Sequence, residues 1–302
     1  MMNKKLAYLI LTHNDPVHLE RLVNAIDYNA DIYIHVDKKT NASQFSSLKN
    51  RCIFIENRVD ISWADISMID AQIELLRAAI VNSHLYTHMI FLSGSCYPIK
   101  NINEINEMFQ KNRTKEFINF IDMRESPLKY MTHIKRKWFF RPLIRSDNLV
   151  TKFIDRAIRK LLRIIKFQNY WQPGIIPYFG SQWCALTPEC ASYVLDFHDQ
   201  NPWFRDMNRH TMSPDEHYFH TIVGNSNFLE ASGGVQEFEG DGTWRMANLH
   251  VIDKSLSKWF CEDDWNDIKG SEYFFVRKVR SKDGTSFVNK INKEILKIET
   301  CN

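Results

Sequence analysis

Apolar runs and helical repeats alternate along the first 120 residues of the chain. The run 6–11 contains no charged residue, as expected of a strand that is covered on both faces. The next segment repeats Leu19, Leu22 and Ile26 at helical spacing, and Asn14 or Asp15 can cap it with Pro16 in its first turn. The same criteria predict further strands at 31–37, 52–55, 88–92 and 116–121, and helices at 69–81 and 101–110.

This alternation favours an α/β fold, in which a mostly parallel, doubly wound sheet carries helices on both faces. Ligands of such sheets bind beyond the carboxyl ends of the strands. Three of the predicted strand ends are polar: Thr12-His13-Asn14, His35-Val36-Asp37 and Ser93-Gly94-Ser95. We therefore expect a nucleotide site there. It differs from the usual dinucleotide fold, because no GxGxxG follows the first strand.

The second half of the chain predicts a strand over 179–187, a helix that Thr187 caps with Pro188 in its first position, and a last helix near 287–298. Ser213-Pro214-Asp215-Glu216 has the pattern of a capping box, in which Ser213 and Glu216 bond each other's amides at a helix start. No repeat or low-complexity linker divides the sequence. We expect one domain over residues 1–302, with a helical basic insertion at about 122–176.

The insertion contains a helix with two contrasting faces. Six basic residues fall on one face: Lys152, Arg156, Arg159, Lys160, Arg163 and Lys166. Six apolar residues fall on the other: Phe153, Ile154, Ala157, Ile158, Leu161 and Ile165. Such a helix either lies on an anionic membrane surface or packs on the core with a solvated basic side.

Composition narrows the class of protein. The chain has 302 residues, of which 44% are hydrophobic and 25% charged, so a sizeable core is expected. A net charge of only +3 argues against a nucleic-acid partner. No run reaches the ~20 apolar residues of a membrane span, and the first residues do not resemble a secretory signal. The 6 cysteines include no CxxC pair, so we expect reduced thiols in a cytoplasmic protein.

Ordered segments give the sequence a family resemblance. It resembles the core-2/I-branching N-acetylglucosaminyltransferases, a family that also contains the peptide-O-xylosyltransferases, over about residues 6–280. The segments that carry it are Ala7-Tyr8-Leu9-Ile10-Leu11-Thr12-His13, Ile34-His35-Val36-Asp37-Lys38-Lys39, Ile61-Ser62-Trp63-Ala64-Asp65-Ile66-Ser67, Leu92-Ser93-Gly94-Ser95-Cys96-Tyr97-Pro98-Ile99-Lys100, Gly180-Ser181-Gln182-Trp183, Ser213-Pro214-Asp215-Glu216-His217 and Phe274-Phe275-Val276-Arg277-Lys278.

The resemblance implies a GT-A fold and an inverting transfer from a UDP-sugar to a hydroxyl of a glycan acceptor. The family's catalytic base corresponds to Glu216, and its diphosphate-binding lysine to Lys278, with Arg277 adjacent. A second family arginine has no clean match; His250 falls near its place, and Arg245 is a substitute from another position. No D-x-D triplet occurs, and the family works without that metal, so we expect no metal cofactor.

The same resemblance assigns binding residues. Asp37 matches a position that lines the uridine site, and Thr12, His13 and Trp63 are expected beside it. Asp65 stands where relatives carry a small residue and is a possible helix cap. Acceptor contacts are expected from Glu125, from Lys135 within the cluster 135–138, and from Trp183 or Trp244 stacking on a sugar.

Two alternatives to a metal-independent glycosyltransferase stay open at this point. The fold can belong to a UDP-sugar- or carbohydrate-binding protein without catalysis, since the family arginine and the residue at Asp65 depart from the pattern. A metal-dependent enzyme would draw on Glu239, Asp241, Asp263 or Asp264. The donor is N-acetylglucosamine or xylose, and without a predicted anchor the enzyme would act in the cytoplasm, at the inner face of the membrane, on lipid-linked or capsular-type precursors.

Overall fold

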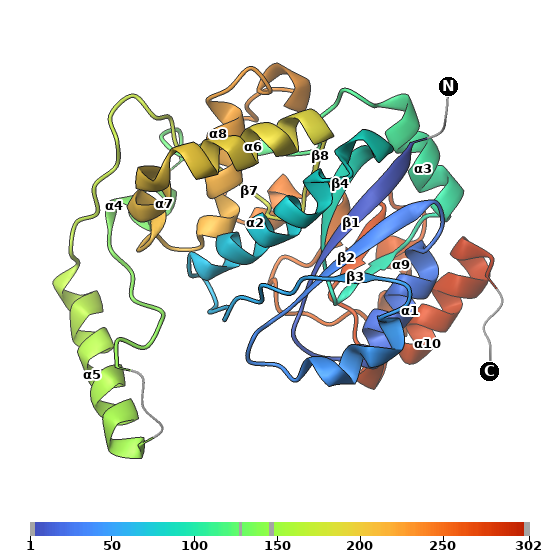
Figure 1. Cartoon of the computed structure of the whole chain (residues 1–302), viewed down its shortest axis with the longest axis horizontal. Helices are drawn as coiled ribbons and strands as arrows, with labels where there is room; N and C mark the ends of the chain where they lie inside the picture. The colour runs from blue at the N-terminus through green and yellow to red at the C-terminus, as the bar shows by residue number, and fades with distance from the viewer. Residues whose placement is uncertain (1–3, 127–128, 145–147, 299–302) are drawn as a thin grey trace.

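The computed structural model describes residues 4–126, 129–144 and 148–298. A five-stranded sheet in the order β3-β2-β1-β4-β8 forms its centre (Figure 1). The strands β1 (Lys5–Thr12), β2 (Ala30–Val36), β3 (Ile53–Phe54) and β4 (Tyr86–Ser93) run parallel, whereas β8 (Ala185–Leu186) is antiparallel to β4. Parallel pairing aligns the carboxyl ends of β1, β2 and β4 at one edge of the sheet.

Helices cover both faces of this sheet, as the unbroken apolar strands require. Leu6, Tyr8 and Ile10 of β1 face a core that includes α1 (Pro16–Ile26), α3 (Ile102–Lys111) and α10 (Ser281–Ile291). The alternate residues Leu9 and Leu11 face a second core with α2 (Ser67–Ile80), α6 (Pro188–Gln200) and α8 (Tyr218–Gly224). The predicted α/β fold class is confirmed, and the arrangement is consistent with a GT-A-like fold.

The predicted starts of α1 and α6 both have a side-chain cap. Asp15, and not Asn14, caps α1, because its Oδ1 accepts a hydrogen bond from the His18 amide at 3.1 Å. Thr187 caps α6 as predicted, with its hydroxyl accepting from the Cys190 amide at 3.2 Å. The last helix, α10, begins earlier than expected and continues as a π-helical turn, Asn292–Leu296.

Two strand predictions are wrong in extent. Within 116–121, only the end joins a strand, β6 (Phe120–Asp122), and it pairs antiparallel with β7 (Tyr178–Gly180) outside the central sheet. The start of the segment makes only an isolated bridge, from Phe117 to Ala185 of β8, and the buried Glu116 carboxylate accepts hydrogen bonds from the amide and hydroxyl of Thr187. The predicted strand 179–187 is split into β7 and β8, and residues 181–183 between them line the candidate site.

Short elements complete the described chain. A second sheet has the order β5-β10-β9, formed by β5 (Cys96–Pro98), β10 (Phe275–Arg277) and β9 (His250–Ile252). The remaining helices are α4 (Lys129–Lys135), α7 (Pro202–Asn208) and α9 (Trp265–Ile268), and the 3-10 turns are Ala42–Leu48, Ser83–Leu85, Pro214–Glu216, Glu230–Ser232, Thr243–Met246 and Glu262–Asp264.

Within the predicted insertion, α5 (Leu149–Ile165) forms a helix that projects from the body of the molecule (Figure 1). No helix in the described ranges combines the length and apolar character needed to cross a bilayer. That the whole chain forms one domain stays a prediction.

Candidate functional site

A cavity of about 710 Å³ opens at the carboxyl ends of the parallel strands, where the sequence predicts a ligand site. The ends of β1, β2 and β4 supply its floor, and loops from the second half of the chain supply the opposite wall. Eight residues named from the sequence line it: Thr12, His13, Asp37, Trp63, Trp183, Glu216, Arg277 and Lys278. Segments that are more than 260 residues apart in the sequence therefore meet in one site.

The turn after β4 closes tightly over the end of β1. The Gly94 amide donates to the Leu11 carbonyl at 2.8 Å. A Cβ atom at position 94 would lie only 2.5 Å from Thr12 Oγ1, so a side chain there would force the two strand ends apart. Glycine is required at this position for the floor of the cavity to keep its shape.

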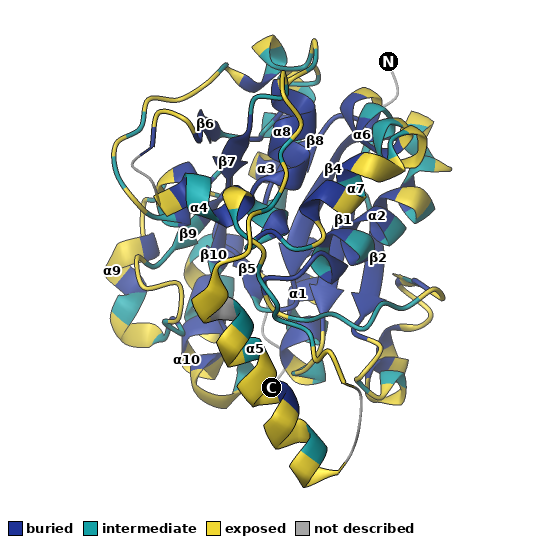
Figure 2. Cartoon of the chain, turned by 90° about the vertical axis from the view of Figure 1, so that its left-hand side faces the viewer, coloured by how far each residue is buried: buried dark blue, intermediate teal, exposed yellow. Residues whose placement is uncertain are grey.

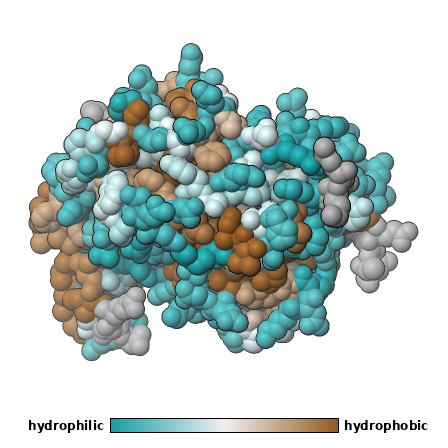
Figure 3. Space-filling model, turned by 45° about the horizontal axis from the view of Figure 1, so that its top comes forward, coloured by the Kyte–Doolittle hydropathy of each residue, from teal (hydrophilic) through white to brown (hydrophobic). Residues whose placement is uncertain are grey.

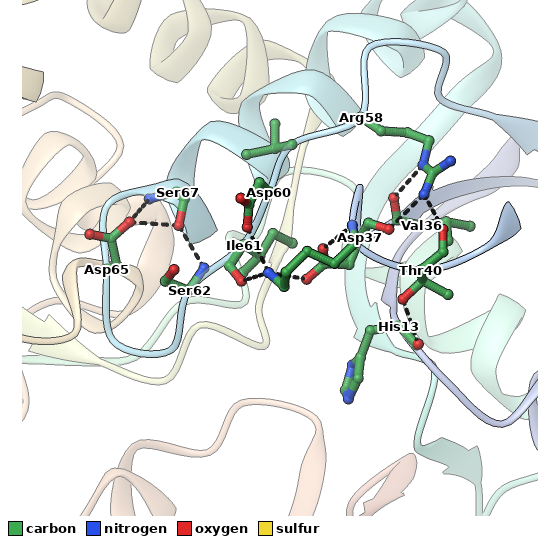
Figure 4. Close-up of polar contacts among 12 residues, drawn as sticks. His13, Val36, Asp37, Thr40, Arg58, Asp60, Ile61, Ser62, Asp65 and Ser67 are labelled. Atoms are coloured by element: carbon green, nitrogen blue, oxygen red, sulfur yellow. Dashed lines mark hydrogen bonds and ion pairs between the residues drawn. The ribbon is translucent and has the colours of Figure 1, made fainter. Parts of the chain in front are cut away.

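Asp37 is held rigidly at the end of β2 (Figure 4). Its amide donates to the Thr12 carbonyl at 2.9 Å, which ties the ends of β1 and β2 together. Its carboxylate accepts from the Lys39 amide at 2.9 Å and lies 3.1 Å from Lys39 Nζ, which also pairs with Asp60 at 2.7 Å. The Arg58 guanidinium donates to the Asp37 carbonyl at 2.7 Å. Asp37 is therefore only 7% exposed, yet it still borders the cavity.

The loop before α2 forms the rim. Trp63 is 73% exposed and packs edge-to-face on Phe140, with ring centroids 5.6 Å apart. The next residue, Ala64, is left-handed with φ 55°, and its carbonyl accepts from the amide of Ser213, which is also left-handed with φ 50°. Non-glycine residues in this conformation store backbone strain, which recurs at functional sites. The contact joins the Trp63 rim to the turn that contains Glu216.

The capping box predicted for 213–216 does not form. Ser213 makes no side-chain cap, and the segment is a single 3-10 turn, in which the Glu216 amide bonds the Ser213 carbonyl at 2.9 Å. The tertiary bond between Ser213 and Ala64 determines the backbone here, and so the Glu216 side chain is not used as a cap. Asp215 and Glu216 both line the cavity instead.

This carboxyl pair has perturbed acidity. Burial raises the pKa of Glu216 well above its usual range, and the neighbouring Asp215 charge raises it further. Burial also raises the pKa of Asp215, to about 6, although its backbone and the Arg277 charge act in the opposite direction. Carboxyls whose pKa is raised by burial and by a neighbouring charge occur often at functional sites, which makes this pair a candidate for proton exchange with a substrate.

Two cations face the same space. Arg277 Nε donates to Ser93 Oγ at 3.1 Å, and its guanidinium lies over the Trp183 ring, 4.5 Å from the centroid. Lys278 lies near Trp259, with Nζ 5.9 Å from the ring centroid. Burial lowers the pKa of both groups. Within the described residues neither cation has an ion pair, so both are available for an anionic ligand.

Other predicted residues lie away from the cavity lining. Glu125 and Lys135 are exposed on the segment before and within α4. His250 is buried behind the wall, with Nε2 3.3 Å from Cys96 Sγ, and burial lowers its pKa to about 3. Arg245 stacks on Trp244 outside the lining, 4.5 Å from the ring centroid. Neither His250 nor Arg245 is among the residues that line the cavity, and the acceptor roles of Glu125 and Lys135 stay predictions.

Asp65, which departs from the pattern that the resemblance implies, is not the N-cap of α2, because Ile66 holds that position, but its side chain bonds the first residue of the helix. Its Oδ1 accepts from the amide of Ser67 at 3.0 Å and from the Ser67 hydroxyl at 2.6 Å at the start of α2. These bonds keep the Asp65 carboxylate turned into the loop (Figure 4).

Several lining residues have no counterpart in the sequence predictions. The segment after β9 contributes Ser255, Leu256, Ser257 and Trp259, and the turn before it contributes Thr243. Their sequence surroundings show neither strand-end polarity nor a helix start. Only the pairing of β9 with β10, which brings the segment beside Lys278, places them at the site.

Three of the four carboxylates considered for a metal site pair with cations, and Glu239 lies 3.7 Å from Arg245. Asp241 pairs with Lys129 at 2.8 Å, and Asp264 pairs with Lys258 at 2.5 Å. Across the residues that the structure describes, no group of three or more His, Cys, Asp or Glu side chains is arranged to hold a metal ion.

Known proteins share sequence similarity with this chain. The sequence model of the family described as Branch, Core-2/I-Branching enzyme, matches residues 6–233. The chain is 22% identical to xylosyltransferase 2 of Pan troglodytes over 309 residues, which cover 97% of this chain and 33% of that protein. It is 25% identical over 255 residues to a Homo sapiens protein named probable beta-1,3-galactosyl-O-glycosyl-glycoprotein beta-1,6-N-acetylglucosaminyltransferase 7, which covers 80% of this chain and 53% of that protein. The chain thus spans about a third of the length of the xylosyltransferase.

Proposed function

Because the chain belongs to the Core-2/I-branching enzyme family, we propose that it is an inverting glycosyltransferase that moves a sugar from a UDP-sugar to a hydroxyl of a glycan acceptor. One observation supports this most directly: two carboxyls with raised pKa values line the same cavity as two cations that have no ion pair among the described residues. The names of the relatives favour N-acetylglucosamine or xylose as the transferred sugar.

Glu216 is the proposed general base. The acceptor oxygen attacks the anomeric carbon from the face opposite the diphosphate, the bond to the diphosphate breaks, and the hydroxyl proton passes to the Glu216 carboxylate. Burial beside Asp215 raises the pKa of Glu216, which makes its ionised form a stronger base. General-base assistance of this kind contributes typically about 10²–10⁴ in rate.

Arg277 and Lys278 are the proposed electrophilic partners of the leaving group. A departing UDP gains negative charge on its diphosphate, and cations fixed in a partly buried site stabilise that charge without reorganising. Stacking on Trp183 and the bond to Ser93 hold the Arg277 guanidinium in place. We propose that these side chains serve in place of a divalent metal. Full activity in excess EDTA is the expected result, and loss of activity would favour a metal-dependent enzyme.

The nucleotide is proposed to lie over the ends of β1 and β2. Thr12, His13 and Asp37 border that part of the cavity, and the exposed Trp63 ring forms its rim. Trp183 is only 5% exposed and lies beneath Arg277, so it forms a wall more than a stacking platform. Glu125 and Lys135 stay candidates for the acceptor side.

The substitution Glu216→Gln tests the proposal. It preserves the shape of the turn and removes the base, so we expect unchanged UDP binding and a transfer rate lower by about 10²–10⁴. Glu272→Gln, at an exposed position outside the cavity, is the matched control. Transfer by Glu216→Gln at nearly the parent rate would show that another group takes the proton.

The alternative is a protein of the same fold that binds a UDP-sugar or carbohydrate without transferring it. The burial of His250 near the place of the family arginine motivates this reading. Slow hydrolysis of a UDP-sugar by the purified protein would favour the enzyme. Binding of UDP without hydrolysis or transfer would favour the alternative, and absence of UDP binding at millimolar concentration would weaken both.

A cytoplasmic site of action also stays a proposal. The described cysteines at positions 52, 96, 184, 190 and 261 are all free thiols, which suits a reducing compartment. A lipid-linked saccharide is the acceptor class proposed for such an enzyme.

A further inference from the structure

The helix α5 exposes apolar side chains over most of its length. Leu149 is 82% exposed, Phe153 is 72% exposed and Leu161 is 56% exposed. Figure 2 shows exposed residues along nearly the whole helix, and in Figure 3 hydrophobic side chains gather over it. Monomeric soluble proteins rarely expose apolar groups in a contiguous patch of this kind, so the side needs a covering partner.

Among the described residues, the contacts of α5 with the body come from the side of the helix that carries Asp155 and Arg159. The Asp155 carboxylate, 2% exposed, accepts from the amides of Leu143 and Ile144 at 2.7 and 3.1 Å. Arg159 pairs with Asp155 at 2.7 Å and donates to the Phe140 carbonyl at 3.1 Å. These bonds fix the helix in its projecting position, and the alternative of a core-facing apolar side is wrong for the described residues.

The attachment also relates α5 to the cavity. The Phe140 carbonyl accepts a hydrogen bond from Arg159, and the Phe140 ring packs on the exposed Trp63 at the rim. Arg141, on the same segment, donates to the Asp60 carbonyl at 2.7 Å, next to the Asp37 loop. The helix is therefore anchored beside the mouth of the cavity.

Charge decides which partner suits the apolar side. Asp155 is the only acidic residue in the sequence of α5, and its carboxylate pairs with Arg159 and accepts hydrogen bonds from two amides. The exposed charged positions on and directly after the helix are all basic: Lys152, Arg156, Lys160 and Lys166. The side chain of Arg163 lies outside the described part. Two copies of this helix packed together would bring like charges close, whereas an anionic lipid surface complements them.

We propose that α5 lies in the interface of an anionic lipid bilayer, with Phe153 and Leu161 immersed and the basic side at the headgroups. The cavity mouth is then presented to the lipid surface. That this serves a lipid-linked acceptor rests on the proposed transferase function, but the lipid binding itself does not.

Flotation with vesicles tests the proposal on the full chain. We expect binding to vesicles of phosphatidylglycerol mixed with phosphatidylcholine, weaker binding to phosphatidylcholine alone, and loss of binding as salt is added. Phe153→Ser together with Leu161→Ser should lower the partition coefficient at least tenfold. Arg156→Gln together with Lys160→Gln should lower it by about fivefold for each cation removed.

Control variants separate the helix from general surface effects. Val81→Ser alters an apolar side chain that is 75% exposed at the end of α2. Lys49→Gln removes an exposed cation after the 3-10 turn Ala42–Leu48. Neither substitution should change the partition coefficient for vesicles. UDP binding should be unchanged in all the α5 variants, which shows that the fold and the cavity persist. A failed Glu216→Gln test would leave these results unaffected.

Three outcomes would overturn the proposal. Equal binding to neutral and anionic vesicles would remove the role of charge, and partition unaffected by the α5 substitutions would place the contact elsewhere. A dimer in light scattering that Phe153→Ser with Leu161→Ser dissociates, together with no vesicle binding, would show that a second copy covers the helix.

Discussion

Replacing Asp215 by asparagine tests the electrostatic cost of the carboxyl pair that faces the cavity. The Oδ1 atom of Asp215 is buried and has no hydrogen-bond partner among the described residues. Burial raises the pKa of Asp215 from its usual 3.8 to about 6 in the folded protein, against a smaller opposing effect of Arg277. Asparagine has nearly the same shape and cannot ionise, so the substitution removes this cost.

The magnitude follows from the shift of the pKa. A displacement of about two pH units corresponds to about 3 kcal/mol of folding free energy. The folded protein holds the proton to a higher pH than the unfolded chain, so its stability falls as the pH rises from about 4 to about 6. We therefore expect Asp215→Asn to exceed the parent in stability by up to about 3 kcal/mol above pH 6, or roughly 5 °C in Tm, and by little below pH 4.

Urea unfolding followed across this pH range is the appropriate assay. Asp155→Asn provides a matched control of opposite sign. Burial alone would raise the pKa of Asp155, but the Ile144 amide and the Arg159 guanidinium hold it below its usual value. That variant should lose stability at neutral pH, and the loss should fade in acid as the carboxylate is protonated. A destabilised Asp215→Asn, or a gain independent of pH, would refute the reasoning.

Three further predictions concern the same cavity. Lys278→Ala should weaken UDP binding at least tenfold in calorimetry and leave uridine binding unchanged, because its charge meets the diphosphate; equal losses would contradict this role. The value of kcat/KM should rise with pH as Glu216 ionises. Because the Asp215 charge raises the pKa of Glu216, Asp215→Asn should move this rise to lower pH. A pH profile that the substitution leaves unchanged would show that the two carboxyls are not coupled. Gly94→Ala should cost about 1–3 kcal/mol in urea unfolding, since its Cβ meets Thr12 Oγ1, and adding Thr12→Ala should restore part of the loss; no recovery would place the strain elsewhere.

Local patterns in the sequence were sufficient for the four parallel strands of the central sheet. The strand predicted at 6–11 is β1 over Lys5–Thr12, because its apolar residues alternate between two cores and both faces are covered. The polar strand ends at Thr12, Asp37 and Ser93 do meet in one cavity, as parallel pairing requires. Here periodicity and chain connectivity alone determine where the residues lie.

The errors arise where a distant partner decides the backbone. Ser213 and Glu216 have the composition of a capping box, but the bond from Ser213 to Ala64 imposes a left-handed residue that no local pattern signals. Glu116 looked like the start of a strand, yet its carboxylate is buried against Thr187. Trp259 reaches the site only through the pairing of β9 with β10. Such long-range contacts cannot be inferred from one sequence.

The two outer strands of the central sheet have a consequence for how the protein behaves at high concentration. A long open strand edge is a template for pairing with another chain and hence for aggregation. Both β3 and β8 contain only 2 residues, so neither offers a usable length of free backbone. Beyond β3, the Arg58 guanidinium occupies the Val36 carbonyl at 2.9 Å, which caps the end of the longer strand β2. The short outer strands therefore disfavour edge-to-edge pairing of the sheet that supports the cavity with a second copy of the chain.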